Sequence, residues 1–384
     1  MFFKFLLSVL LLRTKLVFIP PPKKKYLLYH KASFFVKEYL EKGSYNILHT
    51  KFDEFNFFIF FKSLFKFKGV KLSTKYVLTY ITYVQPTFII SSIDNQLSHY
   101  NLKKYFEKII IISIQNGVRN FGYRGFEFDI YKDKEYLKSL KLSCDFFFVM
   151  SKKYEKVFSS FIKSKFINSG SIKSNMCPIG KNLNDNIAFI SQYAAHRMNS
   201  AGDPYRYTDE ITIKNALIFC KRENLRCSIL LRTNKKGEKK FYQSILKDYI
   251  EYVDFIKTKS YQENFQVLDK FKLIVSVDST LGYEMISRNK RTVLISCRDQ
   301  FLEKVNDLRR LDFGNTYGEH HSNDGFFWIN RFKKEDEIQK KIRDVYFTSE
   351  EKITTEYQKY KDALFYVDRN NLKLKTILNE KNNK

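Results

Sequence analysis

The residues with the clearest chemical potential in this chain follow the apolar run LIVSV at 273–277. Ser279 and Thr280 stand where a helix would begin, and either hydroxyl can cap that helix. Gly282 would let another group approach the first turn closely, and Glu284 projects from the same turn. Because the first N–H groups of a helix have no partner within it, such a turn can bind an anion. We therefore predict a nucleotide phosphate on Ser279 and Thr280, with Glu284 on the ribose. A plain N-cap and a solvated carboxylate are the alternatives.

Polar residues also follow the other apolar runs that read as strands. In the first half of the chain, on the predicted acceptor side, these residues are Asp94, Asn95, Gln115, Asn116, Gly117 and Arg119. In the second half, on the predicted phosphate side, they are Ser191, Gln192 and Arg232. Because the carboxyl ends of parallel strands share one edge of a sheet, we expect all of these side chains to open on one cleft.

Three of these positions suggest individual roles. Arg232 follows a strand directly, so its guanidinium could clamp a phosphate, although it could equally be a surface arginine. Asp94 is the candidate general base, because partial burial raises the pKa of a carboxyl group; the alternative is the N-cap of the next helix. His99 is a second candidate base, and His320 and His321 could reach the cleft from a loop.

The sequence shows no trio of residues with metal-ligand spacing, and it has neither GxGxxG nor GxxxxGK[ST]. We therefore expect no metal and no cofactor, with the nucleotide acting as part of a substrate. The Gln115-Asn116-Gly117 run could also be only a turn, since Asn-Gly favours turns.

The elements that must position these residues alternate between apolar strands and helices. This alternation predicts an α/β fold with parallel sheets and right-handed crossovers. The predicted strands lie at 26–30, 46–50, 87–92, 109–114, 144–151, 187–191, 226–233, 252–256, 273–277 and 292–296. The stretch 168–186 is rich in Gly, Ser, Asn and Pro and reads as a linker. The predicted division is an extension at 1–24, doubly wound domains at 25–167 and 187–330 that face across a cleft, and C-terminal helices at 331–384.

The chain carries 68 Lys and Arg against 41 Asp and Glu, a net charge of +27. Nucleic-acid binding, an anionic membrane or lipid-linked substrate, and a mere compositional bias are the competing explanations. The lysines are spread along the whole chain, and no nucleic-acid-binding motif is present, so we expect no nucleic-acid partner. The apolar residues 2–12 are too few to span a bilayer and are followed by basic residues. A helix lying in the membrane interface and a helix packed on the protein are equally compatible with them.

The cysteines are five in number, widely spaced and without a CxxC pair. They are Cys144, Cys177, Cys220, Cys227 and Cys297. This pattern argues against a disulfide framework or a zinc site and indicates a reducing compartment.

Several segments together resemble bacterial surface carbohydrate biosynthesis proteins, glycosyltransferases associated with O-antigen and capsule. The segments are FIISSIDNQ (88–96), ISIQNGVRN (112–120), DFFFVMS (145–151), FINSGSIKSN (166–175), AFISQY (188–193) and VDSTLGYE (277–284). The resemblance implies the GT-B fold, made of two Rossmann-like domains, with the acceptor on the first and a nucleotide-sugar on the second. It also implies that Ser279, Thr280 and Glu284 lie on the donor. Where a glycine-rich loop would follow the first strand, YHKAS (29–33) stands instead.

Together these patterns predict a metal-independent transfer of sugar from a nucleotide-sugar to a lipid-linked or growing surface glycan. The expected location is the cytoplasm, on the inner face of the cytoplasmic membrane. A nucleotide-sugar epimerase of the same architecture and a non-catalytic glycan-binding or assembly protein are the alternatives.

Overall fold

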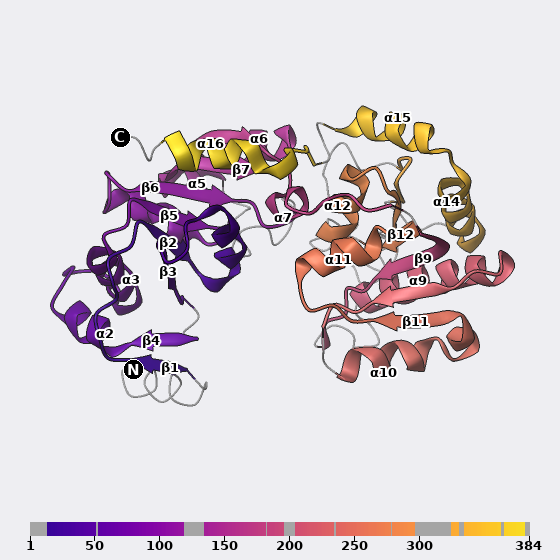
Figure 1. The fold of residues 1–384 in the computed structure, drawn as a ribbon, viewed down its shortest axis with the longest axis horizontal. Helices are drawn as coiled ribbons and strands as arrows, with labels where there is room; N and C mark the ends of the chain where they lie inside the picture. Colours follow the sequence, from indigo (N-terminus) through magenta and orange to yellow (C-terminus); the bar gives the residue numbers. More distant parts are fainter. Residues whose placement is uncertain are drawn as a thin grey trace.

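The computed structural model describes residues 14–50, 53–118, 134–181, 183–195, 204–233, 236–277, 279–295, 324–329, 334–361 and 365–380. Two six-stranded parallel sheets form the centres of two α/β domains that lie side by side (Figure 1). The predicted fold class, with two Rossmann-like domains and C-terminal helices, is confirmed.

The first sheet has the strand order β3-β2-β5-β6-β7-β8, and all of its pairings are parallel. Its strands are β2 (Tyr26–Tyr29), β3 (Tyr45–Leu48), β5 (Phe88–Ser91), β6 (Ile110–Ile114), β7 (Leu142–Val149) and β8 (Ile162–Asn168). β2 and β5 are buried along their whole length, as expected of parallel strands that are covered by helices on both faces.

The helices of the first domain include a 3-10 segment, η1 (Lys31–Tyr39), where the sequence pattern predicts a helix from about 33 to 41. The others are α2 (Phe57–Leu64), α3 (Leu72–Val84), α4 (Leu97–Tyr100), η2 (Asn101–Lys104), α5 (Lys134–Ser139) and α6 (Lys152–Phe158).

The N-terminal part of this domain differs from the prediction at one place. The apolar run at 55–67 reads as a single helix, but the structure has a strand, β4 (Glu54–Asn56), before α2. β4 pairs in parallel with β1 (Lys15–Val17) in a separate two-stranded sheet. Asn56 ends the strand and caps α2, because its side-chain oxygen accepts the N–H of Ile59. A pairing partner 39 residues away therefore overrides the local pattern.

The second sheet has the order β11-β10-β9-β12-β13-β14 and is also parallel. Its strands are β9 (Asn184–Ile190), β10 (Cys227–Leu230), β11 (Val253–Ile256), β12 (Phe271–Ser276), β13 (Arg291–Ile295) and β14 (Trp328–Ile329). Its helices are α9 (Pro204–Arg222), α10 (Lys236–Ile245), η4 (Lys247–Tyr252), α11 (Tyr261–Leu268) and α12 (Thr280–Ser287).

The connection between the domains contains α7 (Ile172–Asn175), and the predicted linker of 168–186 overlaps the last residue of β8 and the first three residues of β9. The C-terminal part comprises α14 (Glu335–Phe347), α15 (Glu350–Tyr360), η7 (Arg369–Asn371) and α16 (Leu372–Glu380). α14 packs on the second domain, against α9 and β13.

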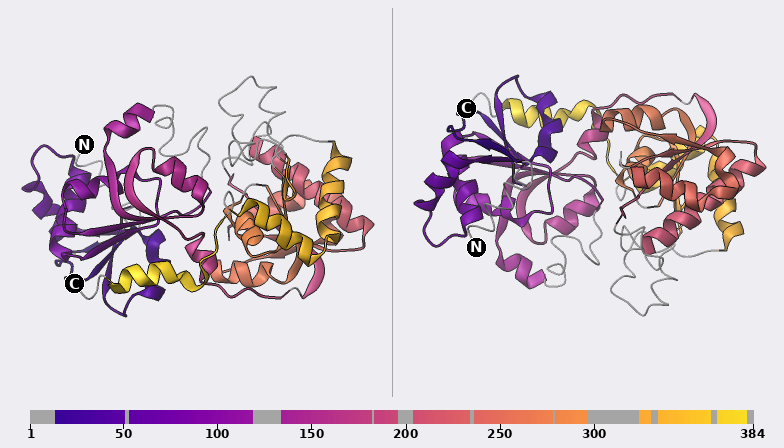
Figure 2. Two further views of the ribbon diagram at one scale, coloured as in Figure 1. Left: turned by 90° about the horizontal axis from the view of Figure 1, so that it is seen from above. Right: turned by 90° about the horizontal axis from the view of Figure 1, so that it is seen from below.

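The last helix returns to the first domain, along which it lies in both views of Figure 2. Leu374 and Leu378 of α16 belong to the same buried cluster as Tyr26 and Phe35. Asn371, just before α16, donates to the Tyr39 hydroxyl at 2.6 Å and to the Ile172 carbonyl at 2.8 Å. The chain therefore passes between the domains twice. None of the helices in the described ranges is both long enough and apolar enough to cross a bilayer.

Candidate functional site

The loop after β6 meets the start of α12, so residues from the carboxyl edges of the two sheets are in direct contact. The Val118 N–H donates to Thr280 Oγ1 at 3.1 Å. A Cβ atom on Gly117 would lie 2.8 Å from the same oxygen, so any larger residue would have to displace the Thr280 hydroxyl. The structure thus brings together two predicted site residues, Gly117 and Thr280, from opposite domains.

Two other predicted residues hold this loop in place. The carboxylate of Asp94, which has no exposed surface, accepts the N–H of Asn116 at 3.0 Å. Gln115 donates to the Gly117 carbonyl and accepts the N–H of Met150, both at 2.9 Å. The loop is therefore tied to the ends of β5 and β7, which explains why a glutamine stands beside the Asn-Gly turn.

The remaining first-domain candidates are less constrained. Asn116 is exposed and accepts a 2.7 Å hydrogen bond from Lys173, whereas Asn95 is half-buried. His99 is fully buried, and desolvation lowers its pKa to about 3. Its imidazole is therefore neutral and has no exposed surface. Arg119, His320 and His321 lie outside the described residues.

The matching edge of the second sheet is built on Glu238, in the first turn of α10, which the sequence analysis missed. This buried carboxylate accepts hydrogen bonds from the Ser191 hydroxyl at 2.6 Å and from the Arg232 N–H at 2.8 Å. It also accepts the Thr233 N–H at 2.7 Å and the Thr233 hydroxyl at 2.8 Å. Glu238 thereby joins the ends of β9 and β10, and Ser191 is part of this support.

The side chain of Arg232 is exposed at this edge, so its guanidinium is available to an anion. One of its terminal nitrogens lies 3.3 Å from the Gln192 carbonyl, which accepts its hydrogen bond. Gln192 is itself half-buried. The structure thus places an accessible cation beside the ends of β9 and β10.

The start of α12 is capped as predicted, since Ser279 Oγ accepts the N–H of Leu281 at 3.3 Å. A Cβ atom on Gly282 would lie 2.8 Å from Leu294 and 3.2 Å from Ser276. The group that approaches Gly282 closely is therefore the underlying sheet, and this glycine serves helix–sheet packing.

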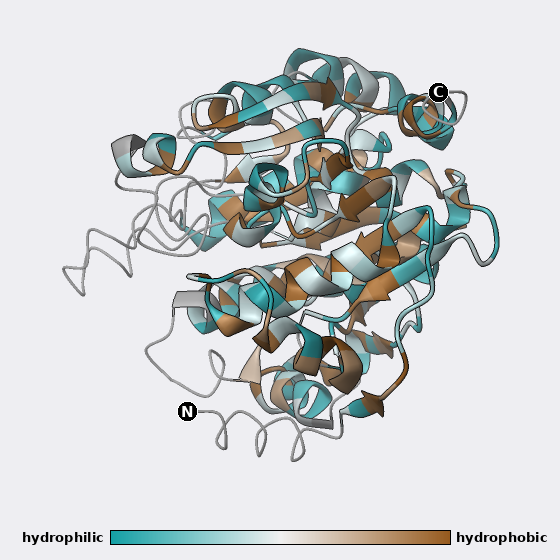
Figure 3. Cartoon of the chain, turned by 90° about the vertical axis from the view of Figure 1, so that its left-hand side faces the viewer, coloured by the Kyte–Doolittle hydropathy of each residue, from teal (hydrophilic) through white to brown (hydrophobic). Residues whose placement is uncertain are grey.

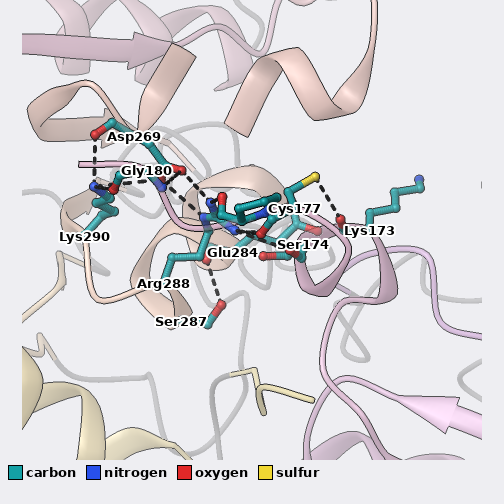
Figure 4. Close-up of polar contacts among 10 residues, drawn as sticks. Lys173, Ser174, Cys177, Gly180, Asp269, Glu284, Ser287, Arg288 and Lys290 are labelled. Atoms are coloured by element: carbon teal, nitrogen blue, oxygen red, sulfur yellow. Dashed lines mark hydrogen bonds and ion pairs between the residues drawn. The ribbon is translucent and has the colours of Figure 1, made fainter. Parts of the chain in front are cut away.

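Glu284 lies on the side of α12 that faces the interdomain linker (Figure 4). Its buried carboxylate accepts a hydrogen bond from the hydroxyl of Ser171, the residue that caps α7. Desolvation raises the pKa of Glu284 to about 7, while Ser171, Lys173 and Arg288 act in the opposite direction. Its protonation therefore changes near neutral pH.

A second set of buried charges fixes the linker to the second domain (Figure 4). Arg288 pairs with Asp269 at 2.5 Å and donates to the carbonyls of Cys177 and Pro178 at 3.0 and 2.7 Å. Lys290 donates to the Gly180 carbonyl at 2.9 Å. The start of the second domain is thus positioned by α12, the same helix that carries Thr280.

The first domain has a pocket of about 190 Å³ at the carboxyl ends of β2 and β3. The described residues that line it contribute hydroxyl, amide, imidazole and aromatic groups, and none of them is Lys, Arg, Asp or Glu. The polar and aromatic lining residues are Tyr29, His49, Thr50, Ser73, Thr74, Tyr76, Gln96 and Ser98. A neutral pocket with aromatic rings suits a sugar better than a phosphate. Sequence reasoning missed it because these residues come from four separate segments.

Within the described part of the chain, no group of three or more His, Cys, Asp or Glu side chains could hold a metal ion. The expectation of a metal-independent reaction stays a prediction.

The fold resembles several solved structures with low sequence identity. The wall teichoic acid polymerase TagF matches with a TM-score of 0.52 and 13% identity over 94% of this chain and 88% of that one. The "putative UDP-N-acetylglucosamine 2-epimerase" of Listeria monocytogenes matches with a TM-score of 0.53 and 9% identity over 94% of this chain and 98% of that one. The S. aureus MnaA–UDP structure matches with a TM-score of 0.52 and 12% identity over 93% of this chain and 97% of that one. No curated protein matches the chain.

These similarities and the two facing sheets define a GT-B fold. A family described as "putative O-antigen biosynthesis protein" matches residues 112–382, which is more than half of the chain. The protein therefore belongs to this O-antigen biosynthesis family, and the resemblance seen in the sequence is confirmed.

Proposed function

We propose that this protein is a glycosyltransferase that moves a sugar from a nucleotide-sugar to a lipid-linked or growing surface polysaccharide. The observation that carries this proposal is the contact between the loop after β6 and the N-terminus of α12, where Val118 donates to Thr280. This contact brings an acceptor-side loop against a donor-side helix start. The family match adds the class of product, a surface glycan.

On the donor side, Arg232 and the first turn of α12 would bind the nucleotide phosphate. The exposed guanidinium follows β10 and the helix N-terminus follows β12, two strands along in the same sheet, so the two could offer a full charge and aligned dipoles to one anion. Glu284 is the proposed ribose ligand, and a ribose hydroxyl would take the place of the Ser171 hydroxyl on its carboxylate. Two structural relatives, TagF soaked with CDPG and MnaA with UDP, have ligands of this kind, which supports a nucleotide as the donor-side ligand.

On the acceptor side, the neutral pocket beside β2 and β3 would hold a sugar of the acceptor. Asp94 is the proposed general base. Because Asp94 is fully buried and holds the Asn116 N–H, the loop must move before an acceptor hydroxyl can reach the carboxylate and give up its proton. The acceptor oxygen would then bond to the anomeric carbon as the sugar–phosphate bond breaks. Arg232 and α12 would stabilise the negative charge on the leaving nucleotide, so the reaction needs no metal.

A thermal-shift screen with nucleoside mono- and diphosphates tests the donor site. Arg232→Ala should weaken the stabilising nucleotide at least about tenfold, since a charge-assisted hydrogen bond is lost. Arg226→Ala is the matched control, because Arg226 stands at the amino end of the same strand, where it pairs with Asp254. If no nucleotide stabilises the wild type, the proposal fails. If Glu284→Ala leaves the shift intact, Glu284 does not bind the ribose.

An epimerase is the second candidate, because the Listeria monocytogenes structure has the same fold. Incubation with nucleotide-sugars alone separates the two activities, since an epimerase converts the donor without any acceptor. Product formation that persists in EDTA would support metal independence.

A further inference from the structure

The helix α2 is apolar on two faces, and only one of them is buried. Ile59 and Phe60 have at most 1% of their surface exposed and pack into the core of the first domain. On the other side, Phe61, Leu64 and Phe65 are 56%, 40% and 85% exposed. A helix at the surface whose outer side is also apolar indicates a contact with an apolar partner.

This exposed surface continues onto the segment after β1. Phe18, 67% exposed, stacks on Phe57 with ring centroids 5.1 Å apart and planes 3° from parallel. Phe57 in turn lies 6.1 Å from Phe61. Ile19, next to Phe18, is 71% exposed. The aromatic face, as we call it here, comprises Phe18, Ile19, Phe61, Leu64 and Phe65.

Lysines accompany the aromatic face. Lys62, Lys68 and Lys71 are exposed and Lys66 is half-buried, all within or directly after α2. No acidic residue occurs between 55 and 93 in the sequence. Figure 3 looks onto the first domain, which carries α2, and shows hydrophobic and hydrophilic residues alternating along its ribbon.

We propose that the aromatic face docks on an anionic lipid bilayer, with its phenylalanines in the acyl boundary and the lysines on the headgroups. Charge decides between the possible occupants. A second copy joined through a twofold axis would place the lysines of both copies together. Residues 1–13 contain Lys4 and Arg13 and no acidic residue, so they too lack complementary charge. An anionic lipid surface supplies both the apolar layer and the negative charge.

The aromatic face lies close to the pocket that we assign to the acceptor sugar, an assignment that rests on the proposed function. α2 packs along α3, and Ser73, Thr74 and Tyr76 of α3 line the neutral pocket of the first domain. An acceptor held in the membrane by its lipid would therefore present its sugars beside the pocket that we assign to them.

The test is sedimentation of the full chain with phosphatidylcholine vesicles that contain or lack phosphatidylglycerol. We expect binding only to the anionic vesicles, and binding that weakens at high salt. Phe61→Gln/Phe65→Gln and Lys62→Glu/Lys66→Glu should each reduce the vesicle partition coefficient at least about tenfold. Circular dichroism and thermal melting establish that the variants are folded.

Two matched controls should bind as the wild type does. Phe347→Gln removes a phenylalanine that is 54% exposed on α14, and Lys163→Glu/Lys165→Glu reverses two exposed lysines on β8, at the far edge of the first sheet. Wild-type vesicle binding by the Phe61/Phe65 variant would overturn the proposal. So would a dimer in light scattering that this variant dissociates, with no vesicle binding. Because the assay needs no nucleotide, failure of the donor-site screen would leave vesicle binding intact, and the two proposals fail separately.

Discussion

Asp94 in the first domain and Glu238 in the second are both fully buried, and both hold the backbone of a loop at the carboxyl edge of a parallel sheet. Asp94 follows β5 and reaches the loop after β6, its neighbour in the sheet. Glu238 comes instead from the helix after β10 and holds the residues that follow β10, together with Ser191, which follows β9. In both domains a buried carboxylate thus accepts backbone N–H groups of a loop, but one carboxylate follows a strand and the other lies in the helix after a strand.

The different positions of the two carboxylates indicate different roles, with Glu238 supporting the structure and Asp94 placed to act in the proposed reaction. Glu238 receives four hydrogen bonds within its own domain and lies under loops that carry the exposed Arg232. Asp94 holds a loop that contacts the other domain through Val118 and Thr280. A change of protonation or position at Asp94 is therefore felt at the junction of the domains, whereas Glu238 shapes one side of it.

The most direct way to break this comparison is Asp94→Asn. If Asp94 is the base, kcat should fall about 100- to 10,000-fold, while the thermal midpoint changes little because the amide oxygen can still accept the Asn116 N–H. Steady-state kinetics and melting curves on the same preparations measure both. A loss of less than about tenfold would mean that Asp94 only positions the loop.

The opposite signature is expected at Glu238. Glu238→Ala leaves buried donors without an acceptor and should reduce the free energy of unfolding by about 3 kcal/mol or more, measured by urea denaturation. Glu238→Gln keeps the shape and some of the acceptors, so it should recover part of the stability and keep kcat within a few-fold. If Glu238→Gln is stable but inactive, Glu238 takes part in the reaction, and the two carboxylates do not differ in role.

Glu284 extends the comparison to a third buried carboxylate, one whose charge depends on pH. Because its folded pKa is about 7 against an ordinary 4.5, its contribution to stability is full below pH 4.5 and is lost as the pH rises to 7. The loss should be about 3 kcal/mol. The glutamine of Glu284→Gln stays neutral, so the difference in free energy of unfolding between wild type and variant should change between pH 4.5 and pH 7 and stay constant above pH 7. If the plots of unfolding free energy against pH are parallel for the two proteins, the pKa of Glu284 is ordinary.

The smallest expected effect concerns the contact between Gly117 and Thr280, which joins the carboxyl edges of the two sheets. Gly117→Ala places a methyl group 2.8 Å from Thr280 Oγ1, which should cost about 1–2 kcal/mol in stability or nucleotide affinity. Thr280→Ala removes the clashing oxygen, so the double variant should recover part of that loss. A double-mutant cycle measures the coupling. Strict additivity of the two substitutions would mean that the domains do not meet at these residues in solution.

Much of the fold could be predicted because the strands are continuous apolar runs with polar residues at their ends, such as LIVSV before Ser279. The run at 55–67 was misread because an apolar stretch of this length fits a helix or a strand, and the pairing of β4 with β1 decides.

The sequence could predict a site residue only where that residue directly follows a strand, because its position then puts it at the carboxyl edge of the sheet. Asp94, Gln115 and Arg232 belong to this class. Glu238 lies within the lysine-rich stretch KKGEKK, which looks like a solvated helix face, and nothing local shows that its side chain turns under the loops. The partner of Glu284, Ser171, is 113 residues away, so the burial that raises its pKa depends on tertiary structure alone.

The return of α16 to the first domain has a consequence for biosynthesis. Leu374 and Leu378 complete a core whose other members include Tyr26 and Leu28, so this domain lacks part of its buried surface until α16 has left the ribosome. The second domain, whose sheet ends at β14, can assemble earlier. The usual N-to-C order of folding is thereby partly reversed, and a nascent first domain would expose an apolar groove for most of its synthesis. Premature termination before residue 372 should therefore yield aggregation-prone chains even though both sheets are present.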